Sequence, residues 1–266
     1  MELNGAHVLI TGASRGIGAA MAEKFAEAGA KVSLVARSRA PMDALSNKIN
    51  GHVFIADLLD PATVDDLISR VESEAGPIDV LVNNAGLETT AWFHEDTIER
   101  IRQVARLNFE APLMLTRAVL PGMLQRGRGS VVFLSSVAGS SAFPGLASYS
   151  GTKAGLNNFV GALRLELRDT PIRFTLVAPG PIDTNMWDHL EQVQDLAPML
   201  KRLRLLQLIP KKSPELVAQR TVAAVKADRR HVRIPRRLIG TLMLSESPRR
   251  ILELALKGVP FVPPKS

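Results

Sequence analysis

The chain has 266 residues, 46% hydrophobic but only 5% aromatic, which suits a single α/β domain with a large aliphatic core. It contains no cysteine, so disulfides, thiolate nucleophiles and cysteine-based metal sites are excluded. The net charge of +7 comes from the end of the chain, because residues 201–266 carry 16 Lys/Arg against 4 Asp/Glu. Residues 1–200 carry 17 Lys/Arg against 22 Asp/Glu. The mildly acidic charge of these first 200 residues argues against nucleic-acid binding by the body of the protein.

Short aliphatic runs alternate with helical patterns along most of the chain. Non-alternating runs of Val, Leu and Ile are typical of strands buried on both faces. These runs predict strands at His7–Thr11, Lys31–Ala36, His52–Ala56, Asp79–Val82, Ser130–Ser135, Ile172–Ala178 and His231–Ile234. Apolar spacings of three and four between them predict helices, among them Ala19–Glu27, Val64–Glu74, Thr97–Leu124, Ser150–Leu167 and one that begins at Ser213.

This alternation predicts the fold class and the domain organisation. Strands joined by helical crossovers form a parallel sheet covered by helices, so we expect an α/β, Rossmann-type, doubly wound sheet of about seven strands with helices on both faces. No linker divides the chain. We therefore predict one domain over residues 1–235, followed by a basic amphipathic C-terminal extension over residues 236–266.

A glycine-rich turn with the sequence T-G-A-S-R-G-I-G connects the first predicted strand to the first helix. Such a turn lets the backbone approach a pyrophosphate and directs N–H groups of a helix N-terminus towards it. We expect Gly12 to make the tight turn, Gly16 to allow the close approach and Gly18 to let helix and strand pack. The position of the turn predicts a dinucleotide site, and a turn without a ligand is the alternative.

Further motifs follow in order along the chain. The spacing T-G-x-x-x-G-x-G resembles the nucleotide motif of the short-chain dehydrogenase/reductase family. The chain also matches that family at Asn83-Asn84-Ala85-Gly86, Asn108, Ser136, Tyr149, Lys153 and Pro179-Gly180. The resemblance covers residues 7–184 and implies an NADP(H)-dependent oxidoreductase of the ketoreductase type. The cofactor contacts expected on this basis are Gly12, Ser14, Arg15, Gly16, Ile17, Gly18, Arg37, Asp57, Leu58, Asn84, Ala85, Gly86, Tyr149, Lys153, Pro179, Gly180, Ile182 and Thr184.

The end of the second predicted strand bears on the choice of cofactor. An NAD-preferring enzyme would place an Asp or Glu there against the ribose 2′-hydroxyl, whereas this chain has Ala36 followed by Arg37. A guanidinium can bind a 2′-phosphate bidentately. Arg15 is similar to a second phosphate-binding residue in NADP(H)-preferring members of the family. We predict a preference for NADP(H), and the alternative is that Arg37 and Arg39 are solvated loop charges.

Tyr149 and Lys153 are four residues apart in a helical pattern, so both side chains project from one face. A nearby ammonium and the positive charge of an oxidised nicotinamide favour the phenolate and lower a tyrosine pKa that is ordinarily about 10. We predict Tyr149 as the acid/base, Lys153 as the group that lowers its pKa, and Ser136 as the group that orients the carbonyl. By resemblance to the family, Asn108 interrupts its helix and supports a proton relay. A tyrosine packed beside a solvated lysine is the alternative.

The segment after Pro179-Gly180 concerns the substrate. In the family, Ile182 and Thr184 match positions that flank the nicotinamide, and residues 185–210 would cover the substrate. The apolar residues of that segment have helical spacing, which implies a lipophilic carbonyl or alcohol substrate, although core or oligomer packing would leave the same stripe. The loop Ala138–Ser148, with Phe143 and Pro144, is expected to line the other side of the pocket.

The sequence of the basic C-terminal extension is compatible with more than one role. An apolar run and a predicted helix capped by Ser247 and ended by Gly258 follow Arg236-Arg237, which resembles an interfacial anchor on an anionic membrane over residues 236–258. A dimer contact or a lid over the substrate is the alternative. We expect a homo-oligomer (dimer or tetramer), no nucleic-acid partner, and no metal, because the five histidines are widely spaced.

No secretory signal and no long apolar run are visible, so we expect a cytoplasmic protein, with peripheral membrane contact as an option. A non-catalytic NADP(H)-binding sensor or scaffold on the same fold is the alternative function.

Overall fold

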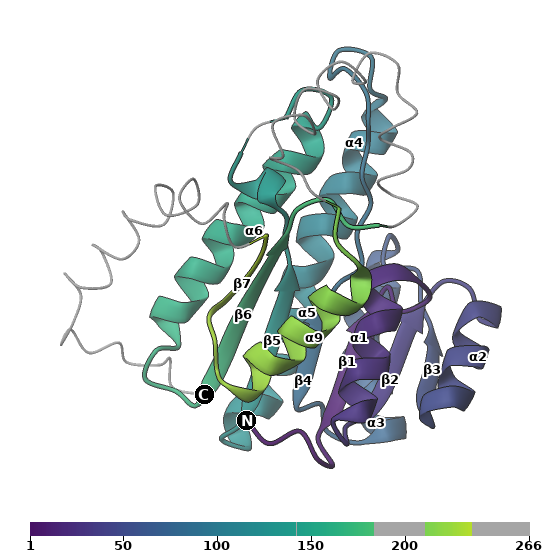
Figure 1. Ribbon diagram of the computed structural model, residues 1–266, viewed down its shortest axis with the longest axis vertical. Coiled ribbons are helices and arrows are strands. Elements are labelled where there is room, and N and C mark those ends of the chain that lie inside the picture. Colours follow the sequence, from purple (N-terminus) through teal and green to yellow (C-terminus); the bar gives the residue numbers. More distant parts are fainter. Residues whose placement is uncertain (142, 184–210, 236–266) are drawn as a thin grey trace.

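The computed structural model describes residues 1–141, 143–183 and 211–235. In these residues seven parallel strands form one sheet in the order β3-β2-β1-β4-β5-β6-β7 (Figure 1). The strands are β1 (His7–Thr11), β2 (Lys31–Ala36), β3 (His52–Ile55), β4 (Val80–Asn83), β5 (Gly129–Leu134), β6 (Ile172–Pro179) and β7 (His231–Ile234). The predicted fold class is confirmed, and the bounds predicted for β1, β2 and β7 are those observed.

Helices cover both faces of the sheet. One face carries α1 (Gly16–Glu27), α2 (Ala40–Ile49) and α9 (Pro214–Lys226), and the other carries α3 (Pro61–Ala75), α5 (Ala111–Gln125) and α6 (Ala147–Glu166). Two aliphatic clusters result, one containing Phe25 of α1 and the other Leu67 of α3, and both side chains are fully buried. Each such side chain contributes about 1.5–3 kcal/mol when it leaves water. Successive residues of a strand point into opposite clusters, so both faces of the strand are buried. This explains why the apolar runs are uninterrupted.

The helix predicted over residues 97–124 is divided in the structure. Thr97 caps α4 (Ile98–Ala105) by accepting a hydrogen bond from the N–H of Arg100 (3.2 Å). A five-residue π-helical turn, η1 (Arg106–Glu110), then separates α4 from α5. Asn108 lies in this turn and is fully buried. The local interruption expected at Asn108 is therefore observed, and π-turns of this kind often occur at functional sites.

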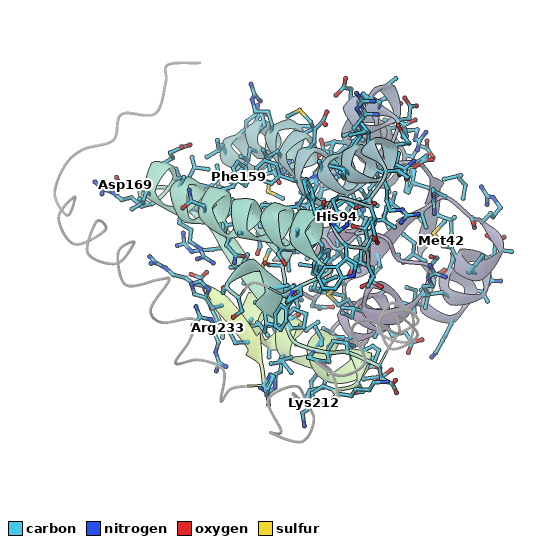
Figure 2. The ribbon with its side chains drawn as sticks, turned by 90° about the horizontal axis from the view of Figure 1, so that it is seen from above. Met42, His94, Phe159, Asp169, Lys212 and Arg233 are labelled. Carbon is cyan, nitrogen blue, oxygen red and sulfur yellow. The ribbon has the colours of Figure 1, made fainter. Side chains whose placement is uncertain are left out.

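The chain reverses its direction of travel across the sheet between β1 and β4. It runs outward from β1 through β2 to β3, and then returns through α3 to place β4 on the other side of β1. In Figure 2, Met42 on α2 and Arg233 on β7 lie towards opposite sides of the view. In sheets of this topology, ligands bind beyond the carboxyl ends of the strands at the reversal, which here lies between β1 and β4.

The described residues on either side of positions 184–210 lie next to each other. Ile182 and Lys212 form a parallel bridge, in which Asp183 N–H donates to the Lys212 carbonyl (2.9 Å) and Lys212 N–H donates to the Pro181 carbonyl (3.1 Å). Thr184, the predicted substrate-covering segment 185–210 and the predicted extension 236–266 lie outside the described residues. Within the described residues, no helix is long and apolar enough to cross a membrane.

Candidate active site

The glycine-rich turn lies at the reversal point between β1 and β4. The Thr11 hydroxyl donates to the carbonyl of Val82 (3.2 Å) and accepts from the N–H groups of Asn84 (3.0 Å) and Ala85 (3.1 Å). The Asn84 amide in turn donates to the carbonyls of Thr11 (2.8 Å) and Gly12 (3.1 Å). These bonds hold the loop after β4 against the turn after β1.

Two glycines are required by this close approach. Gly12 has a φ of +65°, and a Cβ on it would lie 2.8 Å from the Cα of Ala85. A Cβ on Gly18 would collide with the Gly12 carbonyl oxygen and lie 2.5 Å from the Asn84 amide nitrogen. The two predicted roles, a tight turn at Gly12 and close packing at Gly18, agree with this geometry.

The N-terminus of α1 fits an anionic ligand. The helix begins at Gly16 without a side-chain cap at Arg15 and without an acidic residue in its first turn. The first N–H groups of a helix need an acceptor, and the helix dipole favours negative charge there. This end of α1 is therefore suited to a pyrophosphate.

Arg15 and Arg37 lie at the same edge of the sheet. Ala13 N–H donates to the Val35 carbonyl (3.1 Å), which joins the turn after β1 to the end of β2. Arg15 and Arg37 follow these two points at the solvent-exposed surface, and no ion pair joins either of them to another residue in the described part of the chain. Arg39, in contrast, pairs with Asp43 (3.6 Å). Two guanidinium groups are thus available at this edge for a phosphate.

Asp57 and Leu58 follow β3 at the next position along this edge. The Asp57 carboxylate accepts a hydrogen bond from the N–H of Leu59 (3.0 Å), and the Leu58 side chain is buried in the core. The hydrogen bond shapes the turn after β3, and the buried Leu58 side chain anchors this turn to the core.

Tyr149 and Lys153 project from α6 towards the end of β5. The Lys153 ammonium lies 5.6 Å from the centre of the Tyr149 ring and donates to the carbonyl of Leu134 (2.8 Å). Ser136, just after β5, interacts with the Tyr149 hydroxyl and accepts a hydrogen bond from the N–H of Ala138 (3.1 Å). The structure therefore brings together three of the four residues that the sequence predicted as the catalytic group, which are Ser136, Tyr149 and Lys153.

Asn108 joins this group through the loop after β4. Its side chain accepts from the Leu87 N–H (2.8 Å) and donates to the Leu87 carbonyl (2.7 Å). Its amide also lies 3.4 Å from the Thr152 hydroxyl on α6. A Cβ on Gly86 would lie 3.3 Å from the Asn108 oxygen and 3.7 Å from the Lys153 ammonium. Asn108, Gly86 and Lys153 are therefore immediate neighbours.

A second set of bonds holds α6 against β5. The Ser135 hydroxyl donates to the Asn157 side chain (2.5 Å), and the Asn157 amide donates to the carbonyl of Gly139 (3.1 Å). Asn157 lies four residues after Lys153, one turn further along the same face. These bonds fix the rotation of α6, and therefore the direction in which Tyr149 and Lys153 point.

Burial controls the charges at the centre. It raises the pKa of the Tyr149 hydroxyl to about 12, an effect opposed by the interaction with Ser136 and reinforced by the charge of Glu88. Burial also lowers the pKa of the Lys153 ammonium to about 8. The sequence predicted that Lys153 would lower the pKa of Tyr149, but among the protein's own groups desolvation has the larger effect. Tyr149 is therefore protonated at neutral pH.

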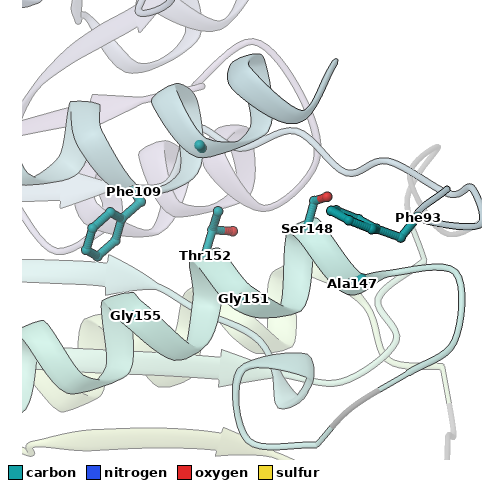
Figure 3. Close-up of a pocket in the computed structure, with 8 residues that line it drawn as sticks. Phe93, Phe109, Ala147, Ser148, Gly151, Thr152 and Gly155 are labelled. Carbon is teal, nitrogen blue, oxygen red and sulfur yellow. The ribbon is translucent and has the colours of Figure 1, made fainter. Parts of the chain in front are cut away.

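An open hollow of about 430 Å³ lies between α6 and the α4–η1 segment (Figure 3). Its lining residues are Phe93, Ala105, Phe109, Ala147, Ser148, Gly151, Thr152 and Gly155. The residues from α6 form a different stripe of that helix from Tyr149 and Lys153, because they are offset by one or two positions in the helical repeat. The hollow thus lies beside the catalytic group without being lined by it.

Several residues of the site had no role predicted from the sequence. Thr11 was recognised only as the first residue of the glycine-rich motif, and Asn157 gave no signal beyond being a polar residue near Tyr149 and Lys153. Glu88 gave no signal at all, because the raised pKa of its carboxyl results from burial, which only the folded chain creates. In the described residues, no group of three or more His, Asp or Glu side chains is arranged to hold a metal ion.

Comparisons with known proteins agree with this arrangement. The family model for short chain dehydrogenase matches residues 6–195. The chain is 35% identical over 196 residues to the 3-oxoacyl-[acyl-carrier-protein] reductase FabG of Escherichia coli (strain K12), a match that covers 73% of this chain and 80% of that protein. It is 33% identical over 193 residues to Dehydrogenase/reductase SDR family member 7B of Mus musculus, which covers 69% of this chain and 60% of that protein.

A solved structure is similar over nearly the whole chain. The short-chain dehydrogenase from Sphingobium yanoikuyae, in complex with NADPH, superposes with a TM-score of 0.80 at 28% sequence identity, covering 96% of this chain and 98% of that one. The glycine-rich turn and Ser136, Tyr149 and Lys153 all lie within residues 6–195, which the family model matches. The chain belongs to the short-chain dehydrogenase/reductase family.

Proposed function

We propose that the protein is an NADP(H)-dependent oxidoreductase that interconverts a carbonyl and an alcohol, with a lipophilic compound as its substrate. The observation that carries the proposal is the meeting of Tyr149, Lys153 and Ser136 beside the glycine-rich turn. The turn and the α1 N-terminus would hold the pyrophosphate, and Arg15 and Arg37 would hold a 2′-phosphate. The NADPH complex of the Sphingobium yanoikuyae protein supports this choice of cofactor.

The chain's own residues account for the proton transfer in the reaction. The nicotinamide supplies the hydride when the cofactor is bound. Tyr149, protonated at neutral pH, donates a proton to the carbonyl oxygen, and Ser136 donates a hydrogen bond that orients that oxygen. The positive charge of Lys153 stabilises the phenolate that remains. The Leu134 carbonyl and the Asn108–Gly86 contact keep the lysine in place.

Two observations support a lipophilic substrate. The E. coli relative is a 3-oxoacyl-[acyl-carrier-protein] reductase, whose name describes an acyl substrate. In this chain Phe143, Pro144 and Leu146 precede Tyr149, so apolar residues lead into the site. The name of that relative makes 3-oxoacyl thioesters the first substrates to try, ahead of steroids, retinal and short ketones.

The test is oxidation of NADPH, followed by its absorbance, across that panel of carbonyls. We expect turnover with at least one lipophilic ketone or aldehyde, and Tyr149→Phe should lower kcat by about 10²–10⁴-fold because the proton donor is lost. NADPH binding, measured by fluorescence titration, should be nearly unchanged. Near-normal turnover by Tyr149→Phe would contradict the role of the tyrosine. Tight NADPH binding without turnover of any carbonyl would favour a sensor or scaffold instead.

A further inference from the structure

Asn157 lies on α6 about two turns after Tyr149 and faces the end of β5. Its side chain is buried in a residue that is 6% exposed, so its amide group has to find hydrogen-bond partners within the protein. Those partners stand directly before and shortly after Ser136, the residue proposed to orient the carbonyl oxygen. Asn157 is therefore placed to control where Ser136 lies.

The first contact of Asn157 is with the residue before Ser136. The Ser135 hydroxyl donates to the Asn157 side-chain oxygen (2.5 Å) and lies 3.4 Å from the Lys153 carbonyl oxygen. Ser135 is itself attached to the sheet, because its N–H donates to the Val177 carbonyl on β6 (2.8 Å). It is 4% exposed, so the protein has to supply the partner of its hydroxyl. This contact ties α6 to the chain on the β5 side of Ser136.

The second contact is on the other side of Ser136. The short 3-10 helix η2 (Val137–Gly139) begins directly after Ser136, which caps it. The Asn157 amide donates to the Gly139 carbonyl at the end of η2 (3.1 Å). A Cβ on Gly139 would lie 2.8 Å from both the Asn157 amide nitrogen and the Lys153 carbonyl oxygen. The end of η2 thus packs directly on α6, and Asn157 is bonded to it.

One side chain therefore holds the chain on both sides of Ser136. It does so with both of its polar groups, since the oxygen accepts from Ser135 and the amide nitrogen donates to Gly139. An aspartate could accept but not donate, and a leucine of similar size could do neither. Because the same helix carries Tyr149, the separation between Ser136 and Tyr149 depends on these two bonds.

We propose that Asn157 is a positioning residue that holds the Ser136 hydroxyl where it can bind the same carbonyl oxygen as the Tyr149 hydroxyl. The inference rests on the proposed function, in which both hydroxyls bind that oxygen. A misplacement of about 1 Å at such a group can lower the rate about 100-fold. The glycine-rich turn that would hold the cofactor is part of neither contact, so loss of Asn157 should lower kcat and leave cofactor binding in place.

Asn157→Leu removes both hydrogen bonds and keeps the approximate size of the side chain. We expect kcat for carbonyl reduction to fall by about 10²-fold, while KM for NADPH stays nearly unchanged. Asn158→Leu is the matched control, because Asn158 is the next residue of α6 and is exposed. It should keep the wild-type kcat. A wild-type kcat in Asn157→Leu, or an equal loss in both variants, overturns the proposal.

A loss of stability is separated from a loss of position by a second substitution. In Asn157→Leu the buried Ser135 hydroxyl loses its acceptor, which costs free energy. Adding Ser135→Ala removes that hydroxyl, so the double variant should regain part of the Tm. Its kcat should stay low, because the Gly139 carbonyl still lacks the donor that held η2. A kcat that recovers together with Tm would show a merely structural role and overturn the proposal.

A double-variant cycle with Ser136 tests the assigned role directly. In the wild-type background, Ser136→Ala should lower kcat by about 10²–10³-fold, because a donor to the reacting oxygen is lost. In the Asn157→Leu background the same substitution should lower kcat much less, since Ser136 has already lost its place. An equal fold-loss in the two backgrounds overturns the proposal.

A measurement without turnover keeps this proposal distinct from the proposed function. Tyr149 is the only tyrosine in the chain, so incorporation of fluorotyrosine gives one fluorine resonance in the NMR spectrum. Ser136→Ala should shift this resonance in the wild-type background and shift it less in Asn157→Leu. Equal shifts in both backgrounds overturn the positioning role. If no carbonyl of the panel is reduced, the proposed function fails, and the fluorine resonance still decides the role of Asn157.

Discussion

Arg37 is an exposed residue on which we propose that the choice of cofactor depends. It follows Ala36 at the end of β2, where an acidic residue would repel a 2′-phosphate. Together with Arg15 it gives the β1–β2 edge two guanidinium groups that have no ion pair within the described parts of the chain. A neutral residue at this position would leave the pyrophosphate site intact but weaken the contact with the phosphate.

Arg37→Gln is expected to weaken NADPH binding by about tenfold or more, because a charge-assisted hydrogen bond to phosphate is lost. NADH binding should be nearly unaffected, since NADH has no 2′-phosphate. Fluorescence titration with both cofactors measures this. Arg39→Gln is the control, because Arg39 is also exposed but already pairs with Asp43 at 3.6 Å. Equal losses for NADPH and NADH would contradict the assignment of Arg37.

At the scale of elements, the joint between β1 and β4 decides whether a nucleotide site exists. The two strands are adjacent only because the chain crosses back at this point, and the Thr11 hydroxyl connects them through three hydrogen bonds. The hydroxyl satisfies two N–H groups of the loop that carries Asn84 and Ala85. Losing it would leave the Ala85 N–H without this acceptor, whereas the Asn84 N–H also donates to the Val82 carbonyl (3.0 Å).

Thr11→Val keeps the shape of the side chain and removes the hydroxyl. We expect the free energy of unfolding to fall by about 1–2 kcal/mol, because the partly buried Ala85 N–H loses its acceptor and the hydrogen bond from the hydroxyl to the Val82 carbonyl is lost. Denaturant unfolding measures the change. Thr221→Val is the matched control: Thr221 is also fully buried, but its hydroxyl donates only to the Val217 carbonyl one turn earlier in α9 (2.8 Å). That carbonyl keeps its helical hydrogen bond, so a loss as large in the control would refute the explanation.

At the scale of the whole molecule, a buried histidine links folding to pH. His7 on β1 is 4% exposed, and its ring contacts the Gly76 carbonyl (2.8 Å) and the Ser33 hydroxyl (2.8 Å). Burial lowers the pKa of His7 below its usual value. At about pH 6.5 and somewhat below, His7 therefore binds a proton in the unfolded chain but stays neutral in the folded protein.

Stability should accordingly decrease as the pH falls from 7 towards 5, because there the unfolded state binds more protons than the folded state. The contribution of one such histidine is at most about 1.4 kcal/mol per pH unit. When the free energy of unfolding, measured with urea, is plotted against pH, its slope should be shallower for His7→Gln than for the wild type. His94→Gln, at a side chain that is 79% exposed, should keep the wild-type slope. Parallel slopes for the wild type and His7→Gln would contradict this account.

Much of the fold could be predicted from the sequence because its signals are local. A run such as His7–Thr11 is apolar throughout, and this reports burial on both faces without any knowledge of its neighbours. The glycines of the first turn and the four-residue spacing of Tyr149 and Lys153 are equally local. The interruption at Asn108 was expected from the family resemblance, since the apolar pattern of residues 97–124 continues through it.

The cofactor preference depended on Ala36 and Arg37 themselves, so the sequence alone could suggest it. By itself the sequence determined the order of the strands and helices along the chain, the turn that begins α1, and the residues that we propose as the catalytic group. Only the tertiary structure decided the charge state of that group. The pKa of Tyr149 is raised by desolvation, which requires neighbours from distant parts of the chain. The same is true of Glu88, since nothing in the residues around it shows that its carboxyl would be buried. Spacing is a property of the chain, whereas burial is a property of the packed molecule.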